Sequence, residues 1–282
     1  MMISLLIISL LFCLCFNCEL HNQSLHNNNN NNNNDSIDYH LLWTIWKLRY
    51  HQYYRNQIDE INSFALWKIN INQILLHNLY YDLQLKTYRK SINQYTAINW
   101  NDFYQNKKNK LNLLHHQKNR LLLLLVKEKY RSFNRTNNNH NNLPDMIDWR
   151  DNDTVTPVKT QVGNCTYSSS KSVTTLSSYI QVDDNEEELQ KAVYNIGPIA
   201  VRITMTQEFL TYGSGVLLID DCQNEEPFES VLLVGYGIEN GIPYWLVKFS
   251  LGEEFGDHGY MKLARNHNNM CHIASFAYYP VI

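Results

Sequence analysis

Residues 231–249 read VLLVGYGIENGIPYWLVKF and contain two apolar runs, Val231–Tyr236 and Tyr244–Phe249, separated by glycine, asparagine and proline. Short runs rich in valine and aromatic residues favour β-strands, and the residues between them favour turns. Three further segments have the same character and are also predicted to be strands: Ile199–Thr204, Val216–Ile219 and Tyr260–Ala264.

One helix is predicted just before this series of strands. The acidic run Glu186–Glu188 suits the positive end of a helix dipole, and Leu189, Ala192 and Val193 supply an apolar face before Gly197. Few helices and many strands in this order predict an α+β domain dominated by antiparallel strands.

The whole chain has 282 residues, enough for one large or two ordinary domains, and a formal net charge of −3. This charge makes neither nucleic acid nor an anionic membrane an expected partner. Residues 1–18 are apolar from Ile3 to Phe16, a run too short to span a bilayer, and they predict a cleaved signal peptide, with an N-terminal anchor as the alternative. We expect no membrane attachment once the signal peptide is removed.

Two asparagine-rich tracts, 27–34 and 137–142, divide the rest of the chain. Such tracts bury too little apolar surface to offset chain entropy, so we expect a disordered segment at 19–37 and a linker at 105–142. The folded parts are then 38–104 and 143–282. Secretion also makes Asn-x-Ser/Thr sequons candidate glycosylation sites, among them those at Asn134, Asn152 and Asn164.

The segment from Ile58 to Leu79 has helical periodicity. One drifting stripe on it contains six residues spaced three or four apart: Asp59, Ser63, Trp67, Asn70, Ile74 and Asn78. Two asparagines on a largely apolar face are unusual, because each requires hydrogen-bond partners.

The second folded part resembles the papain-like cysteine peptidases, in particular their cathepsin L branch. Five blocks carry the resemblance in the family's order: LPDMIDWRDNDTVTPVKTQ (143–161), NEEELQKAVYNIGPIAVRI (185–203), VLLVGYG (231–237), PYWLVKFSLGEEFGDHGYMKLAR (243–265) and CHIASFAYYPVI (271–282).

The first folded part, 38–104, resembles the inhibitory prosegment of that family, which folds over the active-site cleft. The stripe that ends at Asn78 matches the prosegment's long helix motif, and INQYTAINWNDFY (92–104) resembles its second motif. Three residues of the second motif are replaced, by Ser91, Tyr95 and Ala97.

In this family a cysteine at a helix start is the nucleophile, a histidine its base, an asparagine orients the histidine, and a glutamine stabilises the oxyanion. By resemblance Gln161 retains the glutamine, but the other three positions hold Ser168, Glu229 and Phe249. Without an insertion at Val162 the nucleophile position holds Tyr167, and a two-residue shift places Cys165 there.

These replacements remove the chemistry of the family. A solvated carboxylate titrates near pH ~4, so Glu229 is a poor base for a serine hydroxyl, and Phe249 has no hydrogen-bonding group to orient a base. We therefore expect an inactive homologue. The alternative hypotheses are a cysteine peptidase that uses a shifted Cys165 and a serine hydrolase that uses Ser168 with Glu229.

The resemblance also implies an internal deletion near 180–184, because the central helix, expected from about Tyr167 to Tyr179, is followed almost at once by the sheet-rich half. We expect a papain-like fold that lacks most of the helical subdomain, unless a skipped exon explains the gap. The resemblance pairs Cys222 with Cys271 in a disulfide and leaves Cys165 without its partner.

The expected function is therefore binding rather than catalysis. The ligand is a peptide or protein, with an active cathepsin as one candidate, and 38–104 then acts as an inhibitor domain. No metal or other cofactor is expected, and the signal peptide predicts a secreted or lysosomal/endosomal protein.

Overall fold

A computed structural model describes residues 37–109, 143–160, 170, 174, 176–220, 222 and 228–281. The chain forms two compact units, residues 1–49 and 50–282, so the division lies inside the segment 38–104 that we expected to be one domain. The first unit contains α2 (Tyr39–Arg49), whose buried Trp43 and Trp46 stack with their ring centroids 4.9 Å apart.

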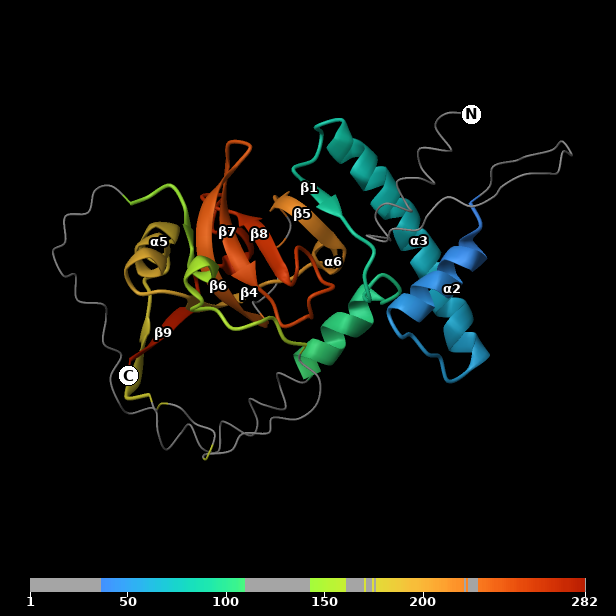
Figure 1. Cartoon of the computed structure of the whole chain (residues 1–282), viewed down its shortest axis with the longest axis horizontal. Helices are drawn as coiled ribbons and strands as arrows, with labels where there is room; N and C mark the ends of the chain where they lie inside the picture. Colours follow the sequence, from blue (N-terminus) through green and yellow to red (C-terminus); the bar gives the residue numbers. More distant parts are fainter. Residues whose placement is uncertain are drawn as a thin grey trace, which may run out of the picture. The chain divides into compact units, whose positions relative to one another are not determined.

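The second unit contains a nine-stranded sheet in the order β1-β5-β8-β7-β6-β4-β9-β3, with β2 added beside β6 (Figure 1). Only the β5–β8 pair on this path is parallel. The strands are β1 (Tyr88–Lys90), β2 (Ile147–Asp148), β3 (Ser178–Gln181), β4 (Ile199–Ile203), β5 (Tyr212–Leu217), β6 (Glu229–Glu239), β7 (Ile242–Lys248), β8 (Tyr260–Ala264) and β9 (Ala277–Val281).

All five strands predicted from the sequence are present, as β4 to β8, and β8 has the predicted bounds. The predicted helix is α5 (Glu186–Asn195), with Leu189, Ala192 and Val193 buried and the Asn185 side chain accepting the N–H of Glu188. The unit also contains α3 (Gln57–Asp82), α6 (Gln207–Leu210), a helix at 100–109, and the 3₁₀ helices η1 (Trp149–Asn152) and η4 (Met270–His272). None of the helices in the described part of the chain is long and apolar enough to cross a membrane.

The expected extent of the central helix is wrong at its end. Ser178–Gln181 is not helical but forms β3, which pairs antiparallel with β9 at the edge of the sheet. Leu176 and Tyr179 are 64% and 55% exposed, so neither has the buried environment that a central helix requires. Tyr179 and Ile180 in this stretch favour a strand once the backbone of β9 offers hydrogen bonds.

The two asparagines of the α3 stripe bond to the backbone of the segment that follows the helix. Asn70 donates from Nδ2 to the carbonyl of Thr96 at 2.7 Å. Asn78 donates to the carbonyl of Lys90 at 2.9 Å and accepts its N–H at 2.8 Å. The backbone N–H and carbonyl of Lys90 both bond to α3. On its other side, β1 pairs with β5 (Figure 1).

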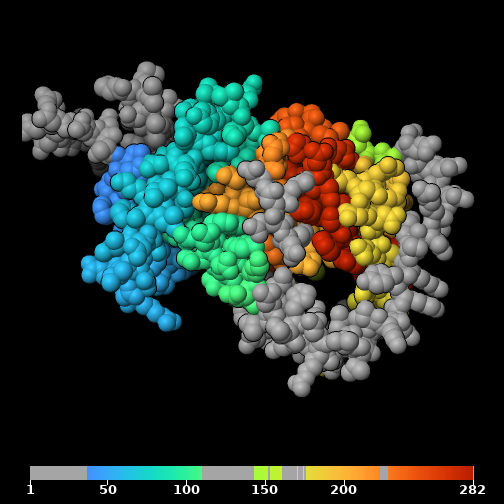
Figure 2. Space-filling model, turned by 180° about the vertical axis from the view of Figure 1, so that it is seen from behind, coloured from blue at the N-terminus to red at the C-terminus, as the bar shows by residue number. Residues whose placement is uncertain are grey.

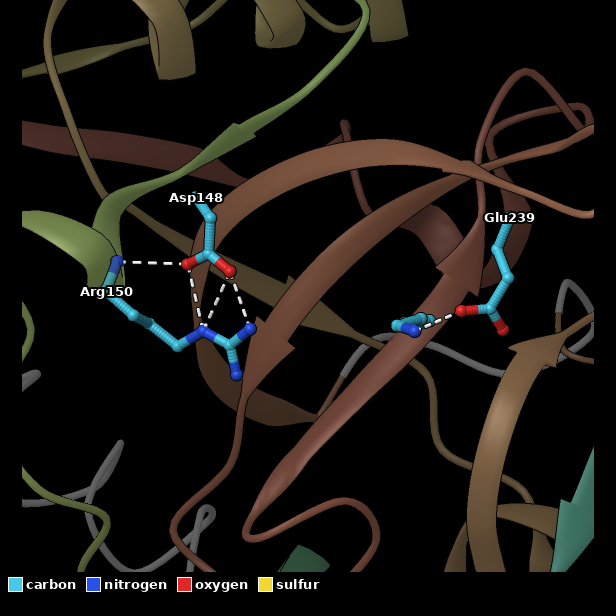
Figure 3. Close-up of polar contacts among 4 residues, drawn as sticks. Asp148, Arg150 and Glu239 are labelled. Carbon is cyan, nitrogen blue, oxygen red and sulfur yellow. Dashed lines mark hydrogen bonds and ion pairs between the residues drawn. The ribbon is translucent and has the colours of Figure 1, made fainter.

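Ion pairs join neighbouring elements of the sheet. Asp148 of β2 accepts hydrogen bonds from the N–H and guanidinium of Arg150 in η1 (Figure 3). Burial opposes ionisation of Asp148, but these hydrogen bonds outweigh it and hold its pKa below the usual value. Glu239 at the end of β6 pairs with Lys262 of β8.

The core of the sheet-rich half includes a disulfide between Cys222 and Cys271, both fully buried and separated by 49 residues. Closing a loop of this length removes about 4 kcal/mol of entropy from the unfolded chain at 25 °C. The bond ties η4 to the segment that follows β5.

Replacement of both half-cystines by alanine is therefore expected to lower the free energy of unfolding by about 3–5 kcal/mol. Urea unfolding followed by tryptophan fluorescence measures this loss. The matched control is Cys165→Ala, which leaves the disulfide intact and is expected to change stability far less. Equal losses in the two variants would contradict the structural role of the bond.

Candidate functional site

Glu229, at the position that the resemblance assigns to the catalytic histidine, is the first residue of β6 and faces Ile203 of β4 across the ladder. Glu229 as a whole is only 4% exposed. Lys107 Nζ lies 3.0 and 2.9 Å from its two carboxylate oxygens, so both oxygens accept hydrogen bonds from one ammonium. The carboxylate at the position of the base therefore forms an ion pair with Lys107.

Lys107 belongs to the helix at 100–109, which extends beyond residue 104, where we expected the linker to begin. Figure 2 shows this helix (green) as part of the packed surface of the second unit. Trp100, Tyr104 and Lys107 share one helical face, and both aromatic rings contact Phe228, at centroid distances of 6.5 and 5.0 Å. Phe228 directly precedes Glu229, so the helix contacts this end of β6 through aromatic rings as well as through the ion pair.

Phe249, at the position of the orienting asparagine, lies in the hydrophobic core and is 1% exposed. Its ring contacts Phe255 and Phe209, at centroid distances of 5.1 and 6.3 Å. Its N–H donates to the carbonyl of Gly259. The side chain acts as a packing group that has no polar atom to offer a base.

Two residues from segment 92–104 bind the backbone beside Phe249. The carbonyl of Leu251 accepts hydrogen bonds from Gln94 Nε2 at 2.9 Å and from the Tyr95 hydroxyl at 3.0 Å. The Tyr95 ring contacts both Phe103 and Phe255 edge to face. Burial raises the pKa of Tyr95, so its hydroxyl remains a donor.

A second set of polar contacts joins β1 to α6. Glu208 accepts a hydrogen bond from the Tyr88 hydroxyl at 2.6 Å and pairs with Lys90 Nζ at 2.6 Å. Burial opposes ionisation of Glu208, but the charge of Lys90 and the hydrogen bonds from Lys90 and Tyr88 together outweigh it, so the pKa of the carboxyl lies below its usual value. The carboxylate therefore stays ionised and holds β1 in place.

Several predicted positions lie outside the described residues, namely Gln161, Cys165, Ser168, Asn134 and Asn164. The third candidate sequon, Asn152, is the last residue of η1. His267 contacts Asp220 at 2.9 Å and His272 contacts Thr204 at 3.2 Å, so each has a partner of its own. The described part of the chain contains no group of three or more histidine, cysteine or acidic residues placed to bind a metal.

Three side chains contact this site without having been predicted to do so from the sequence: Gln94, Tyr95 and Lys107. The spacing of Trp100, Phe103, Tyr104 and Lys107 is i, i+3, i+4, i+7, which extends a helical pattern past residue 104. That pattern predicts the helix, but it does not show that Lys107 meets a residue 122 positions away.

Phe249→Ala is expected to lower the free energy of unfolding by about 3–5 kcal/mol, because it opens a cavity between Phe209 and Phe255. Chemical denaturation measures the change, with the partly exposed Phe276→Ala as the matched control. Phe249→Asn is expected to be at least as destabilising, since it buries an unpaired amide. Retention of full stability by Phe249→Asn would show that the site still accommodates the family's polar residue.

Comparisons with known proteins agree with this architecture. The papain family profile, described as "Papain family cysteine protease", matches residues 160–281. A cathepsin L-like proteinase of Fasciola hepatica is 27% identical over 316 residues, covering 86% of this chain and 93% of that protein. Testin-2 of Rattus norvegicus is 39% identical over 131 residues, covering 45% of this chain and 39% of that protein.

Among solved structures, the digestive procathepsin L2 proteinase of Tenebrio molitor larval midgut has a TM-score of 0.73 at 23% identity, covering 86% of this chain and all of that one. This likeness concerns the fold: an α+β sheet domain with a helical segment packed against it. The sequence blocks, the profile match and the shared fold agree. Residues 160–281 match the papain family of cysteine peptidases, and the chain is similar over most of its length to cathepsin L-like members of that family.

Proposed function

We propose that this protein is a catalytically inactive papain-family homologue that acts by binding. The observation that carries the proposal is the buried ion pair of Glu229 with Lys107. A general base must reach a proton on the nucleophile or on water. Both oxygens of Glu229 are engaged by an ammonium instead, and the residue is buried.

The electrostatics of the pair work against base catalysis. The ammonium of Lys107 lies at hydrogen-bond distance from both carboxylate oxygens of Glu229, so these oxygens already act as acceptors within the chain. An ionised carboxylate also repels a thiolate, whereas the histidinium of active relatives attracts it. Neither a cysteine nor a serine nucleophile gains from such a neighbour.

The substrate-binding half of the cleft also differs from that of active relatives. The alignment with the Fasciola protein extends over 316 residues, more than the 282 of this chain, so part of that relative has no counterpart here. The strand β3 stands where the end of the central helix was expected. Both observations support an internal loss of the helical subdomain, which includes much of the wall that binds peptides.

A signal peptide at 1–18 would direct the protein to the secretory or endosomal route. It would meet its ligand there. Its ligand is a peptide or protein rather than a nucleic acid, as the net charge of −3 favours.

The test is an activity assay on the chain from Glu19 onward, produced with its disulfide intact. Fluorogenic peptides and a thiol-directed epoxide are applied at neutral and acidic pH beside an active cathepsin L-like enzyme. We expect kcat/KM at least about 10⁴-fold below that enzyme, which corresponds to the loss of the base and its orienting group.

Two variants separate the possible nucleophiles. Turnover that disappears in Cys165→Ala would overturn the proposal in favour of a cysteine peptidase. Turnover that survives Cys165→Ala and disappears in Ser168→Ala would overturn it in favour of a serine hydrolase. Full retention of a low signal in both variants points to a contaminant and supports inactivity.

A further inference from the structure

The position of the catalytic histidine has a partner within this chain, and that partner points to a new role. We propose that Glu229 is a docking socket for Lys107, which makes residues 50–109 a permanently bound module rather than a removable prosegment. The inference rests on the proposed function in one respect: a socket filled by Lys107 is not a working catalytic centre. It goes further by naming what the remodelled site binds, a lysine-bearing amphipathic helix.

The socket is charge-specific. The side chains of Glu229 and Lys107 are 6% and 23% exposed, so the carboxylate is buried while the ammonium that pairs with it keeps partial contact with solvent. Removing one partner of such a pair leaves the other charge buried without compensation, which is strongly unfavourable. Lys107 also lies over the Phe103 ring, 5.7 Å from its centroid, which orients the ammonium toward the sheet.

Apolar contacts surround the charged pair. Phe228, the residue before Glu229, contacts Trp100 and Tyr104 of the same helix that carries Lys107. Trp100 in turn stacks on Phe103 at 5.8 Å. Buried aromatic anchors next to a charged pair are the kind of contact that contributes most of the binding energy at protein interfaces.

Further attachments lie away from the helix and act together with it. Strand β1 pairs with β5, and Asn93 Nδ2 donates to the carbonyl of Leu210 at 2.8 Å. Gln94 and Tyr95 bind the carbonyl of Leu251. Because one continuous segment makes all these contacts, release of any one leaves the others in place at high effective concentration.

The charge of Lys107 also defines which partner the module fits. Opposite a carboxylate it gains an ion pair, but opposite the histidinium of an active family member it meets a like charge. The module therefore fits a papain-like half with an acidic residue at the position of Glu229, in the first place that of its own chain. Inhibition of an active cathepsin is disfavoured by the same lysine.

The test cuts the folded chain between the two parts and asks whether they separate. A recognition sequence for a site-specific protease replaces residues 137–142, and the purified, folded protein is cleaved there. We expect the two fragments to elute together in size-exclusion chromatography at pH 7.5 and at pH 5. Separation of the wild-type fragments at either pH would overturn the inference.

Exchange with a fluorescent N-terminal fragment then measures the dissociation rate of the cleaved complex. We expect Lys107→Met to dissociate about 100-fold faster, because truncating one partner of a buried charge pair acts mainly on the off-rate. The matched control is Lys108→Met on the same helix, whose ammonium donates a hydrogen bond to the Tyr104 hydroxyl. Equal rates for the two variants would also overturn the inference.

A charge swap tests the socket independently of folding defects in single variants. Lys107→Glu is expected to separate the cleaved fragments. Combining Lys107→Glu with Glu229→Lys is expected to restore their association, with exchange at least about tenfold slower than in Lys107→Glu alone. Absence of rescue in a double variant with wild-type circular dichroism contradicts the pairing. Fragment separation without turnover overturns only this inference, whereas turnover by the intact chain overturns the proposed function and, with it, the premise that the filled socket is not a working catalytic centre.

Discussion

A buried carboxylate at the start of β6 requires a counter-charge, and in this protein the counter-charge comes from a helix far earlier in the chain. Glu229 and Lys107 are 122 positions apart in the sequence and form two hydrogen bonds. The pair fixes the position of the helix at 100–109, and the helix in turn places Trp100 and Tyr104 against Phe228. A residue whose position in relatives serves proton transfer thus organises the contact between two parts of one chain.

The neighbouring family positions have changed in the same direction. Phe249 joins the aromatic core where an asparagine would hold a base, and the backbone of Leu251 receives Gln94 and Tyr95. In the inactive protein that we propose, each of these contacts contributes to packing or attachment instead of to substrate turnover. A catalytic centre stores strain and buried polar groups at a cost in stability, so the proposed loss would permit a more stable arrangement of the same fold.

Much of the fold follows from local sequence patterns. The strands β4 to β8 and the helix α5 are predicted from apolar runs, turn residues and an acidic first turn, because these signals lie within each element. The asparagines of α3 are predicted to need partners, and the structure provides them from the backbone of Thr96 and Lys90. Here the sequence pattern predicts that the asparagines need hydrogen-bond partners, but it does not predict which groups supply them.

The errors and omissions have a common physical origin. The central helix was expected by resemblance to run to about Tyr179, but Ser178–Gln181 pairs with β9 because a neighbouring strand edge offers backbone hydrogen bonds. Likewise, the helical spacing up to Lys107 is visible in the sequence, yet its ion pair depends on the folded position of Glu229. Contacts between distant segments decide both cases, and no local propensity encodes them.

The central claim is that Glu229 acts as the partner of Lys107, and a double-mutant cycle on the unfolding of the intact chain measures it most directly. The cycle comprises Lys107→Met, Glu229→Gln and the double variant, each unfolded in urea at neutral pH. If the two side chains interact as described, the loss in the double variant is smaller than the sum of the single losses by more than about 1 kcal/mol. Additivity within about 0.3 kcal/mol would contradict the account, because it would leave Glu229 buried without the partner on which the rest of the site depends.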